Sequence, residues 1–275
     1  MNVRRFEASA PGPSLLLLGG VHGEEKPGVV ALERLAHEFG AGRLRLLKGS
    51  ISIVPRVNAL AVERGVHQVD ENLNRIVRAH AAPATREQHL ANELLPLIEA
   101  ADAVLDLHGT PSPTLPFAFL DDESPANKAW ADAVGVDFLL TGWPALYAAG
   151  GTVTTTEYAQ SLGKRALTIE VGQNEDRGAS DKAFTFAART LAHFGLISPF
   201  SSAPKPRVLR FTRVIHREPD GRLARDWKNF DPVAKGEILA RYAGRTIEAP
   251  EPGFVVMPFA DAETGMEWLY LAVPA

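Results

Sequence analysis

Three short apolar runs, each followed closely by a residue suited to metal binding or proton transfer, constrain this chain more than any other feature. The runs and the residues that follow them are 15–19 with His22, 103–107 with His108, and 166–169 with Glu170. Consecutive apolar positions of this length are typical of strands buried on both faces of a parallel sheet. Because ligands of open α/β sheets gather at the carboxyl ends of the strands, we expect the three polar side chains to meet there.

The segment around the first run predicts a βαβ unit. Gly19 and Gly20 allow the backbone to turn after the strand. Pro27 suits the first turn of a helix, and apolar residues at helical spacing follow as far as Gly40. Residues 51–55 form the next apolar run, so the order strand, turn, helix, strand predicts a parallel pair.

The alternation of helix and strand continues to about residue 200. Further helices are predicted at 85–100, where Thr85 and Gln88 form a capping-box pattern, at 125–134 and at 180–194. The polar segment 56–78 is interpreted as a long functional loop, and the segment 142–156, rich in Gly, Ala and Thr, as a mobile loop.

The pattern changes after residues 199–206, whose Pro and Ser content indicates a linker. The runs that follow are short and strand-like, at 208–214, 237–242, 253–257 and 268–272. We therefore predict an α/β domain over residues 1–203 and a small antiparallel β domain over residues 204–275 that caps the site.

The polar residues at the strand ends have the chemistry of a catalytic zinc site. A short His-x-x-Glu motif such as His22 with Glu25 is common by chance, but His108 supplies a third ligand and leaves a fourth position for water. Glu170 ends an otherwise apolar strand, and buried carboxylates are costly unless paired, metal-bound or catalytic, so it is the candidate base. The chain has no cysteine, so one zinc ion per chain would be held by nitrogen and oxygen alone.

Charge and hydropathy exclude several classes of partner. A formal net charge of -4 gives no basic field for nucleic acid. The apolar run 15–18 is too short for a signal peptide or a membrane span, so we expect a cytoplasmic protein without membrane contact. The sequence leaves a homo-oligomer open.

Four motifs, taken together, resemble the succinylglutamate desuccinylase/aspartoacylase family, a branch of the zinc carboxypeptidase-like hydrolases. They are residues 19–25, 72–75, 106–110 and 169–172, and they occur in the family's order. The resemblance covers most of the chain, because the family also has a C-terminal β domain. It implies a zinc carboxypeptidase-like α/β/α sandwich with a mixed, mostly parallel sheet.

The resemblance also assigns roles to individual residues. It implies zinc ligands at His22, Glu25 and His108, with Glu170 as general base and later general acid. Asn74 and Arg75 match the pair that holds the substrate's α-carboxylate, a task for which arginine's bidentate fork is suited. Asp106 either orients His108 or is only structural.

The chain departs from the family at several positions. The slot of the arginine that polarises the scissile carbonyl holds His67, and the nearest arginine is Arg64, so one of these two is expected to stabilise the oxyanion. Asn72 replaces an aspartate. Gln160 occupies the slot of an arginine that binds the acidic side chain in aspartoacylase, and it is expected to contact substrate. With fewer cations, a neutral or basic substrate side chain is favoured over an acidic one.

The sequence favours a zinc-dependent deacylase acting on an N-acyl amino acid or a similar small amide. A carboxypeptidase acting on short peptides is the alternative within the same fold. A zinc-binding protein without hydrolase activity is the alternative from another class, motivated by His67 in the arginine slot; the strand-end base Glu170 argues against it.

Overall fold

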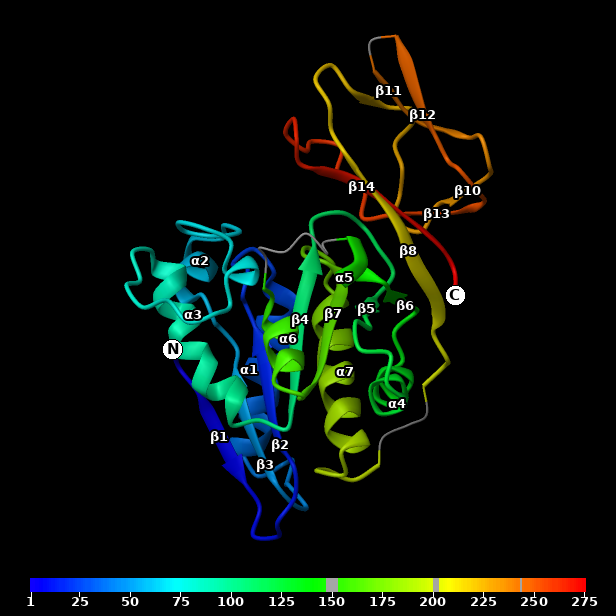
Figure 1. Ribbon diagram of the computed structural model, residues 1–275. Coiled ribbons are helices and arrows are strands. Elements are labelled where there is room, and N and C mark those ends of the chain that lie inside the picture. Colours follow the sequence, from blue (N-terminus) through cyan, green and yellow to red (C-terminus); the bar gives the residue numbers. More distant parts are fainter. Residues whose placement is uncertain (147–152, 200–202, 243) are drawn as a thin grey trace.

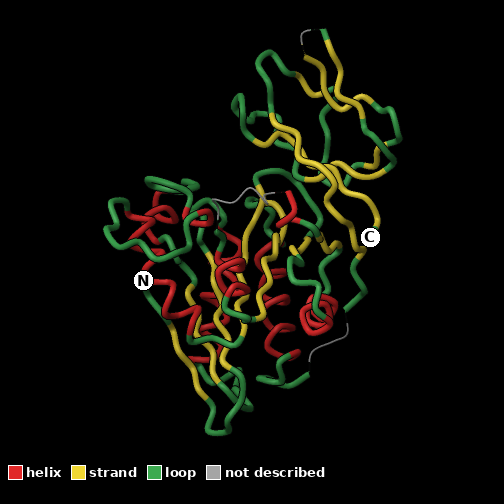
Figure 2. The backbone as a smooth tube through the Cα atoms, viewed as in Figure 1, coloured by secondary structure: helices red, strands yellow, loops and turns green. Residues whose placement is uncertain are grey.

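A large mixed sheet flanked by helices forms the body of the protein, and a second, three-stranded sheet lies beyond one end of it (Figures 1 and 2). The computed structural model describes residues 1–146, 153–199, 203–242 and 244–275. The large sheet has the strand order β1-β3-β2-β4-β7-β5-β6-β8-β14-β13-β10, and the small sheet has the order β12-β11-β9.

The helical segments alternate with strands over the first two-thirds of the chain. They are α1 (Lys26–Gly40), α2 (Ala59–Arg64), the 3-10 turn η1 (Leu73–Arg75), α3 (Arg86–Glu99), α4 (Pro125–Val134), α5 (Trp143–Leu146), α6 (Thr155–Ser161) and α7 (Ala179–His193). The strands are β1 (Arg4–Glu7), β2 (Ser14–Gly19), β3 (Ser50–Val54), β4 (Ala103–Thr110), β5 (Phe117–Phe119), β6 (Phe138–Thr141), β7 (Arg165–Gln173), β8 (Arg207–His216), β9 (Arg222–Leu223), β10 (Pro232–Val233), β11 (Ile238–Tyr242), β12 (Arg245–Glu248), β13 (Gly253–Val256) and β14 (Glu267–Pro274).

The centre of the large sheet is parallel, as the alternating pattern predicts. β2 pairs in parallel with β3 on one side and with β4 on the other, and β4 pairs in parallel with β7. β1 and β5 are antiparallel to their neighbours β3 and β7, which makes the sheet mixed. The predicted βαβ unit of β2, α1 and β3 is confirmed.

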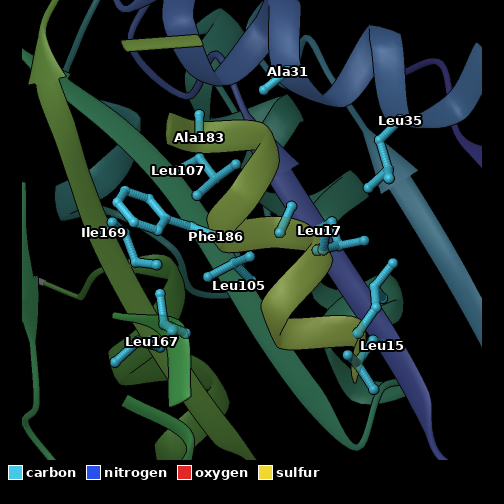
Figure 3. Packing of buried hydrophobic residues seen from close by; sticks show 14 of the residues in the cluster. Leu15, Leu17, Ala31, Leu35, Leu105, Leu107, Leu167, Ile169, Ala183 and Phe186 are labelled. Atoms are coloured by element: carbon cyan, nitrogen blue, oxygen red, sulfur yellow. The ribbon is translucent and has the colours of Figure 1, made fainter. Parts of the chain in front are cut away.

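Alternate side chains of the central strands enter two separate cores. Leu15 and Leu17 of β2 pack in a cluster with α1, α4 and α7, as Figure 3 shows for α1 and α7. Leu16 and Leu18 belong to the cluster on the opposite face, with α3 and α6. Both faces of β2 are therefore removed from water, which is the main favourable term in folding. This arrangement confirms the predicted α/β/α sandwich.

The interpretation of residues 56–78 as a loop is wrong in part, because the segment contains α2 and η1. Asn58 caps α2 by accepting a hydrogen bond from the Ala61 backbone N–H at 3.3 Å, and Gly65, with φ of 64°, ends it in the left-handed region. A helix this short is too brief to show a periodic apolar face. The expected loop 142–156 likewise contains α5 and the start of α6, while residues 147–152 lie outside the described part of the chain.

The C-terminal strands continue the large sheet. β8 pairs in parallel with β6, and β14, β13 and β10 follow in antiparallel order. The antiparallel character expected after the linker is confirmed, but the apolar run of β8 gave no sign of its pairing with β6. The boundary at residues 203 and 204 stays a prediction, and residues 200–202 of the linker lie outside the described ranges. Among the helices of those ranges, none has both the length and the apolar character needed to cross a bilayer.

Candidate active site

The carboxyl ends of β2, β4 and β7 bring the predicted polar residues together. His108 lies near the end of β4 and is the register partner of Glu170 on β7. His22 and Glu25 lie on the turn between β2 and α1. His22, Glu25 and His108 are buried, and the buried Glu170 Oε2 has no hydrogen-bond partner within the described ranges. The three separate runs of the sequence thus converge on one site.

Close backbone packing fixes the turn that carries His22 and Glu25. Gly20 has φ of +61°, which favours glycine. A Cβ on Gly23 would lie 2.0 Å from the carbonyl carbon of Ala61, so α2 packs directly against the turn. The Gly23 N–H also donates to the carbonyl of Val66 at 3.0 Å. These contacts leave the turn little freedom to move.

Glu25 lies between the two buried histidines. Its Oε1 is 2.8 Å from His22 Nδ1, and its Oε2 is 2.9 Å from His108 Nδ1. The other ring nitrogen of each histidine meets an oxygen: His22 Nε2 is 3.1 Å from Asn72 Oδ1, and His108 Nε2 is 3.0 Å from Asp106 Oδ2. When the proton of each ring is on Nε2, both Nδ1 atoms present lone pairs on the side of the carboxylate, which is the tautomer that metal-ligating histidines adopt.

Charge interactions within this group shift the pKa values of Glu25 and His108. Burial alone would raise the pKa of Glu25, but His22 and His108 outweigh it and hold the pKa below its ordinary value. Burial alone would lower the pKa of His108, but Asp106 and Glu25 raise it well above the ordinary value. Without a metal, a proton on His108 compensates the charged Glu25 carboxylate; a metal ion such as zinc, which the donor set fits, would replace that proton.

His67 is a third histidine, adjacent to this group. Its ring stacks on that of His22 with centroids 3.8 Å apart, and ligand atoms of His22, Glu25 and His67 all lie within 4.8 Å of one another. Its side chain is 45% exposed, however, and its Nδ1 is 2.6 Å from Glu24 Oε1. Its Nε2 is 3.2 Å from Asn72 Nδ2. His108 is thus the buried candidate for the third ligand and His67 the exposed one.

The environment of Glu170 is suited to proton transfer. Burial, followed by the negative charge of Glu25, raises the pKa of Glu170 to about 8, with His108 acting in the opposite direction. A carboxyl group with a pKa near neutrality can both accept and return a proton.

These residues open into a cavity of about 120 Å³ at the end of the sheet. Its lining consists of His22, Asn74, Arg75, His108, Phe119, Asp121, Trp143, Thr154, Thr156, Thr168, Glu170 and Met257. Arg75 contributes a guanidinium group to this lining, and its Nη1 donates to the carbonyl of Asn74 at 2.9 Å. Asn74 Oδ1 in turn accepts from the backbone N–H of Thr155 at 3.0 Å, which joins η1 to the start of α6.

Comparison with protein families gives a match over residues 11–196 to the succinylglutamate desuccinylase/aspartoacylase catalytic domain. The chain belongs to this family. A succinylglutamate desuccinylase of Pseudoalteromonas atlantica is 25% identical, over 95% of this chain and 81% of that protein. An N-alpha-acetyl-L-2,4-diaminobutyric acid deacetylase of Halomonas elongata is 26% identical, over 88% of this chain and 73% of that protein.

Solved structures of the desuccinylase/aspartoacylase type share the fold. The product-bound ectoine utilization protein EutE (DoeB) of Ruegeria pomeroyi superimposes with a TM-score of 0.78 at 23% identity, covering 98% of this chain and 88% of that one. A succinylglutamate desuccinylase of Vibrio cholerae gives 0.80 at 19% identity, covering 97% and 82%. Together with the layers described above, these likenesses confirm the zinc carboxypeptidase-like fold.

Some of the positions assigned to catalysis and substrate binding by the resemblance line the cavity, and others do not. Asn74 and Arg75 line the cavity. Arg64 is exposed in the last turn of α2, and Gln160 is half-buried near the far end of α6; neither lines the cavity. Their roles in catalysis and binding stay predictions. Asn72, in the slot of the family's aspartate, still places an oxygen beside His22 Nε2.

The sequence did not predict the role of one residue that supports this aspartoacylase-family site. Glu87 of α3 is fully buried and accepts hydrogen bonds from Asn58 Nδ2 and the Val69 N–H, each at 2.8 Å. It thereby holds the segment between His67 and Asn72. An acidic residue in the first turn of a helix was the only signal, and it is common. Asp106, whose role was open, lies 3.0 Å from His108 Nε2 and accepts from Thr155 Oγ1 at 2.5 Å; its orienting role stays a prediction.

Proposed function

We propose that the protein is a zinc-dependent deacylase that hydrolyses the amide bond of an N-acyl amino acid or a similar small amide. The proposal rests on one observation above all: Glu25 contacts His22 and His108, and these two histidines line a cavity together with Glu170 and Arg75. Family membership supports acyl amino acid hydrolysis in general, since relatives are a desuccinylase and a deacetylase.

Each residue of the site has its own role in the proposed reaction. His22, Glu25 and His108 would hold the ion, which supplies Lewis acidity toward a carbonyl oxygen and a water molecule when bound. Glu170 takes a proton from the attacking water and returns it to the nitrogen of the breaking C–N bond, so that a carboxylate and an amine leave. Arg75 binds the α-carboxylate of the amino acid and fixes the amide near Glu170.

The cavity volume favours a small substrate over a long peptide, because about 120 Å³ is below the 300–1,000 Å³ range of drug-sized sites. Acyl amino acids and dipeptides are of similar size, so a comparison of their turnover separates the two activities. The buried Oε2 of Glu170, which finds no hydrogen-bond partner in the part of the chain that the structure describes, argues against a protein that only binds zinc, because desolvating such a group has a cost that catalysis explains.

A deacylation screen tests the proposal directly. N-acetyl and N-succinyl derivatives of acidic, neutral and basic amino acids would be compared with dipeptides, with the release of primary amine as the readout. We expect turnover of at least one acyl amino acid, no comparable turnover of dipeptides, and a loss of about 100-fold or more in kcat for Glu170→Gln with zinc retained. Hydrolysis of dipeptides alone, or near-normal turnover by the variant, would contradict it.

A further inference from the structure

We propose that Asp121 selects substrates by binding a cationic group, such as an ammonium, on the side chain of the acylated amino acid. The inference rests on the proposed function and specifies its substrate class. It concerns the part of the cavity lining that the end of β5 and α5 contribute.

Asp121 presents an unsatisfied acceptor at the cavity. It follows β5 by two residues and lines the cavity together with Phe119 of that strand. Its Oδ1 is a buried atom that has no hydrogen-bond partner among the described residues. The next residue, Asp122, is engaged differently, because it accepts from Ser124 and Asn127 at the start of α4. Buried polar atoms in folded proteins are nearly always paired, so a buried carboxylate oxygen left open beside a cavity calls for a partner from outside the chain.

The charged side chains that line the cavity suit a substrate that carries one negative and one positive group. Arg75 is the cationic side chain suited to the α-carboxylate. Glu170 is committed to proton transfer. Asp121 then remains as a carboxylate with neither a described ion-pair partner nor a role in the reaction. A substrate with an acidic side chain would place two carboxylates together, whereas an ammonium would meet its complement.

The neighbouring side chains suit a cation as well. Phe119 and Trp143 line the same cavity, with ring centroids 5.1 Å apart in an edge-on arrangement. Aromatic faces attract ammonium groups, most strongly where water is excluded. Met257 adds an apolar surface on which the methylene groups of a long side chain can rest. A carboxylate beside aromatic rings is a combination that binds an ammonium on an alkyl stem.

Electrostatics gives further support. Burial, with an additional contribution from the charge of Glu157, raises the pKa of Asp121 to about 7. The negative charge of this side chain is therefore poorly compensated by the protein itself. A cation bound in the cavity would supply that compensation, so its binding is favoured over that of a neutral group of the same shape.

Matched pairs of substrates test the inference. Nα-acetyl and Nα-succinyl derivatives of 2,4-diaminobutyrate and ornithine would be compared with those of norvaline and norleucine, which replace the ammonium by a methyl group. Glutamate derivatives supply the acidic case. The measurement is kcat/KM at pH 8, with kcat and KM determined separately, for the wild type, Asp121→Asn and Asp121→Glu. Glu123→Gln is the control, because Glu123 is an exposed carboxylate paired with Arg210 at 2.9 Å and outside the cavity lining.

We expect the wild type to prefer the ammonium substrate over its neutral match by about 10- to 100-fold, as charge-assisted hydrogen bonds allow. Asp121→Asn should reduce that ratio to about one, mainly through a higher KM, Asp121→Glu should restore part of it, and Glu123→Gln should leave it unchanged. The wild-type ratio is informative even if Asp121→Asn fails to fold.

The two proposals fail in different ways. If the wild type hydrolyses neutral or acidic substrates at least as well as cationic ones, or if Asp121→Asn keeps the wild-type ratio, the inference about Asp121 is wrong and the deacylase proposal stands. If no acyl amino acid of any charge is hydrolysed by the zinc-loaded protein, the proposed function is wrong, and the inferred substrate class, which depends on it, is wrong as well.

Discussion

His108 and Glu170 are register partners in the parallel strands β4 and β7. Residues opposite each other in neighbouring strands project to the same face of a sheet, so the pairing places an imidazole and a carboxylate side by side at the carboxyl edge. Their electrostatic interaction is one of the influences on the Glu170 pKa, where His108 acts against burial and Glu25. One hydrogen-bonded ladder therefore aligns a candidate metal ligand with the candidate base.

The identity of the third metal ligand is open to a direct test. We expect the purified protein to carry about one zinc ion per chain, and His108→Ala to lose most of it, because His108 is buried against Glu25. His67→Ala should keep its zinc, since His67 is exposed and bonded to Glu24. Metal analysis after dialysis without chelator measures both. Zinc retained by His108→Ala and lost by His67→Ala would reverse the assignment.

Asp106 should control metal affinity through His108. Its Oδ2 is 3.0 Å from His108 Nε2, and partners of this kind typically change metal affinity by about 10- to 100-fold. We expect Asp106→Asn to weaken zinc binding by that factor in a competition titration with a chromophoric chelator. Asp102→Asn is the matched control, because Asp102 precedes the same strand and bonds Ser14, away from the site. Equal affinities for the two variants would exclude the orienting role.

Glu87 should stabilise the segment that carries His67 and Asn72. Its carboxylate accepts from Asn58 Nδ2 and from backbone N–H groups of Val69, Asp70 and Glu71. Glu87→Gln would replace one of the two carboxylate oxygens by an NH2 group and leave the donors to that oxygen unsatisfied, at a cost of about 1–3 kcal/mol in the free energy of unfolding.

Urea denaturation measures this cost. Glu93→Gln on the same helix is the control, because Glu93 is half exposed and pairs with the amino terminus, a surface contact worth about 0–1 kcal/mol. A Glu87→Gln variant no less stable than this control would show that the buried carboxylate is dispensable.

Asp121 should make the stability of the unliganded protein depend on pH. Burial, then Glu157, raises its pKa to about 7 from 3.8, so the folded state binds a proton more tightly than the unfolded state. The contribution of this proton to the free energy of unfolding is fully present below the unfolded pKa and is lost as pH rises toward 7. It amounts to about 1.4 kcal/mol for each pH unit by which the folded and unfolded pKa values differ. The melting temperature should therefore fall less steeply between pH 4 and pH 8 for Asp121→Asn than for the wild type.

The control for this pH dependence is Glu123→Gln, which removes an exposed carboxylate two residues away. It should follow the wild-type curve. Parallel curves for Asp121→Asn and the wild type would mean that Asp121 titrates normally.

The sequence predicted the centre of the molecule better than its edges. The apolar runs that became β2, β4 and β7 are buried on both faces, so their pattern survives in the sequence and places His22, His108 and Glu170 correctly at one end. Asp121 gave no such signal, because it follows the short strand β5 and only tertiary packing makes it part of the cavity. The helix α2 was missed because a six-residue helix depends on its cap and on contact with the turn at Gly23.

The parallel pairing of β6 with β8 has a consequence for any attempt to isolate the first 203 residues. β6 is fully buried, and its Phe138 ring stacks on that of Phe230 with centroids 3.8 Å apart. A truncated chain would expose a row of unpaired backbone groups and a bare aromatic surface, a combination that recruits other chains and leads to aggregation. The C-terminal strands thus cover the edge of the sheet at β6, and a chain truncated at the linker should be insoluble.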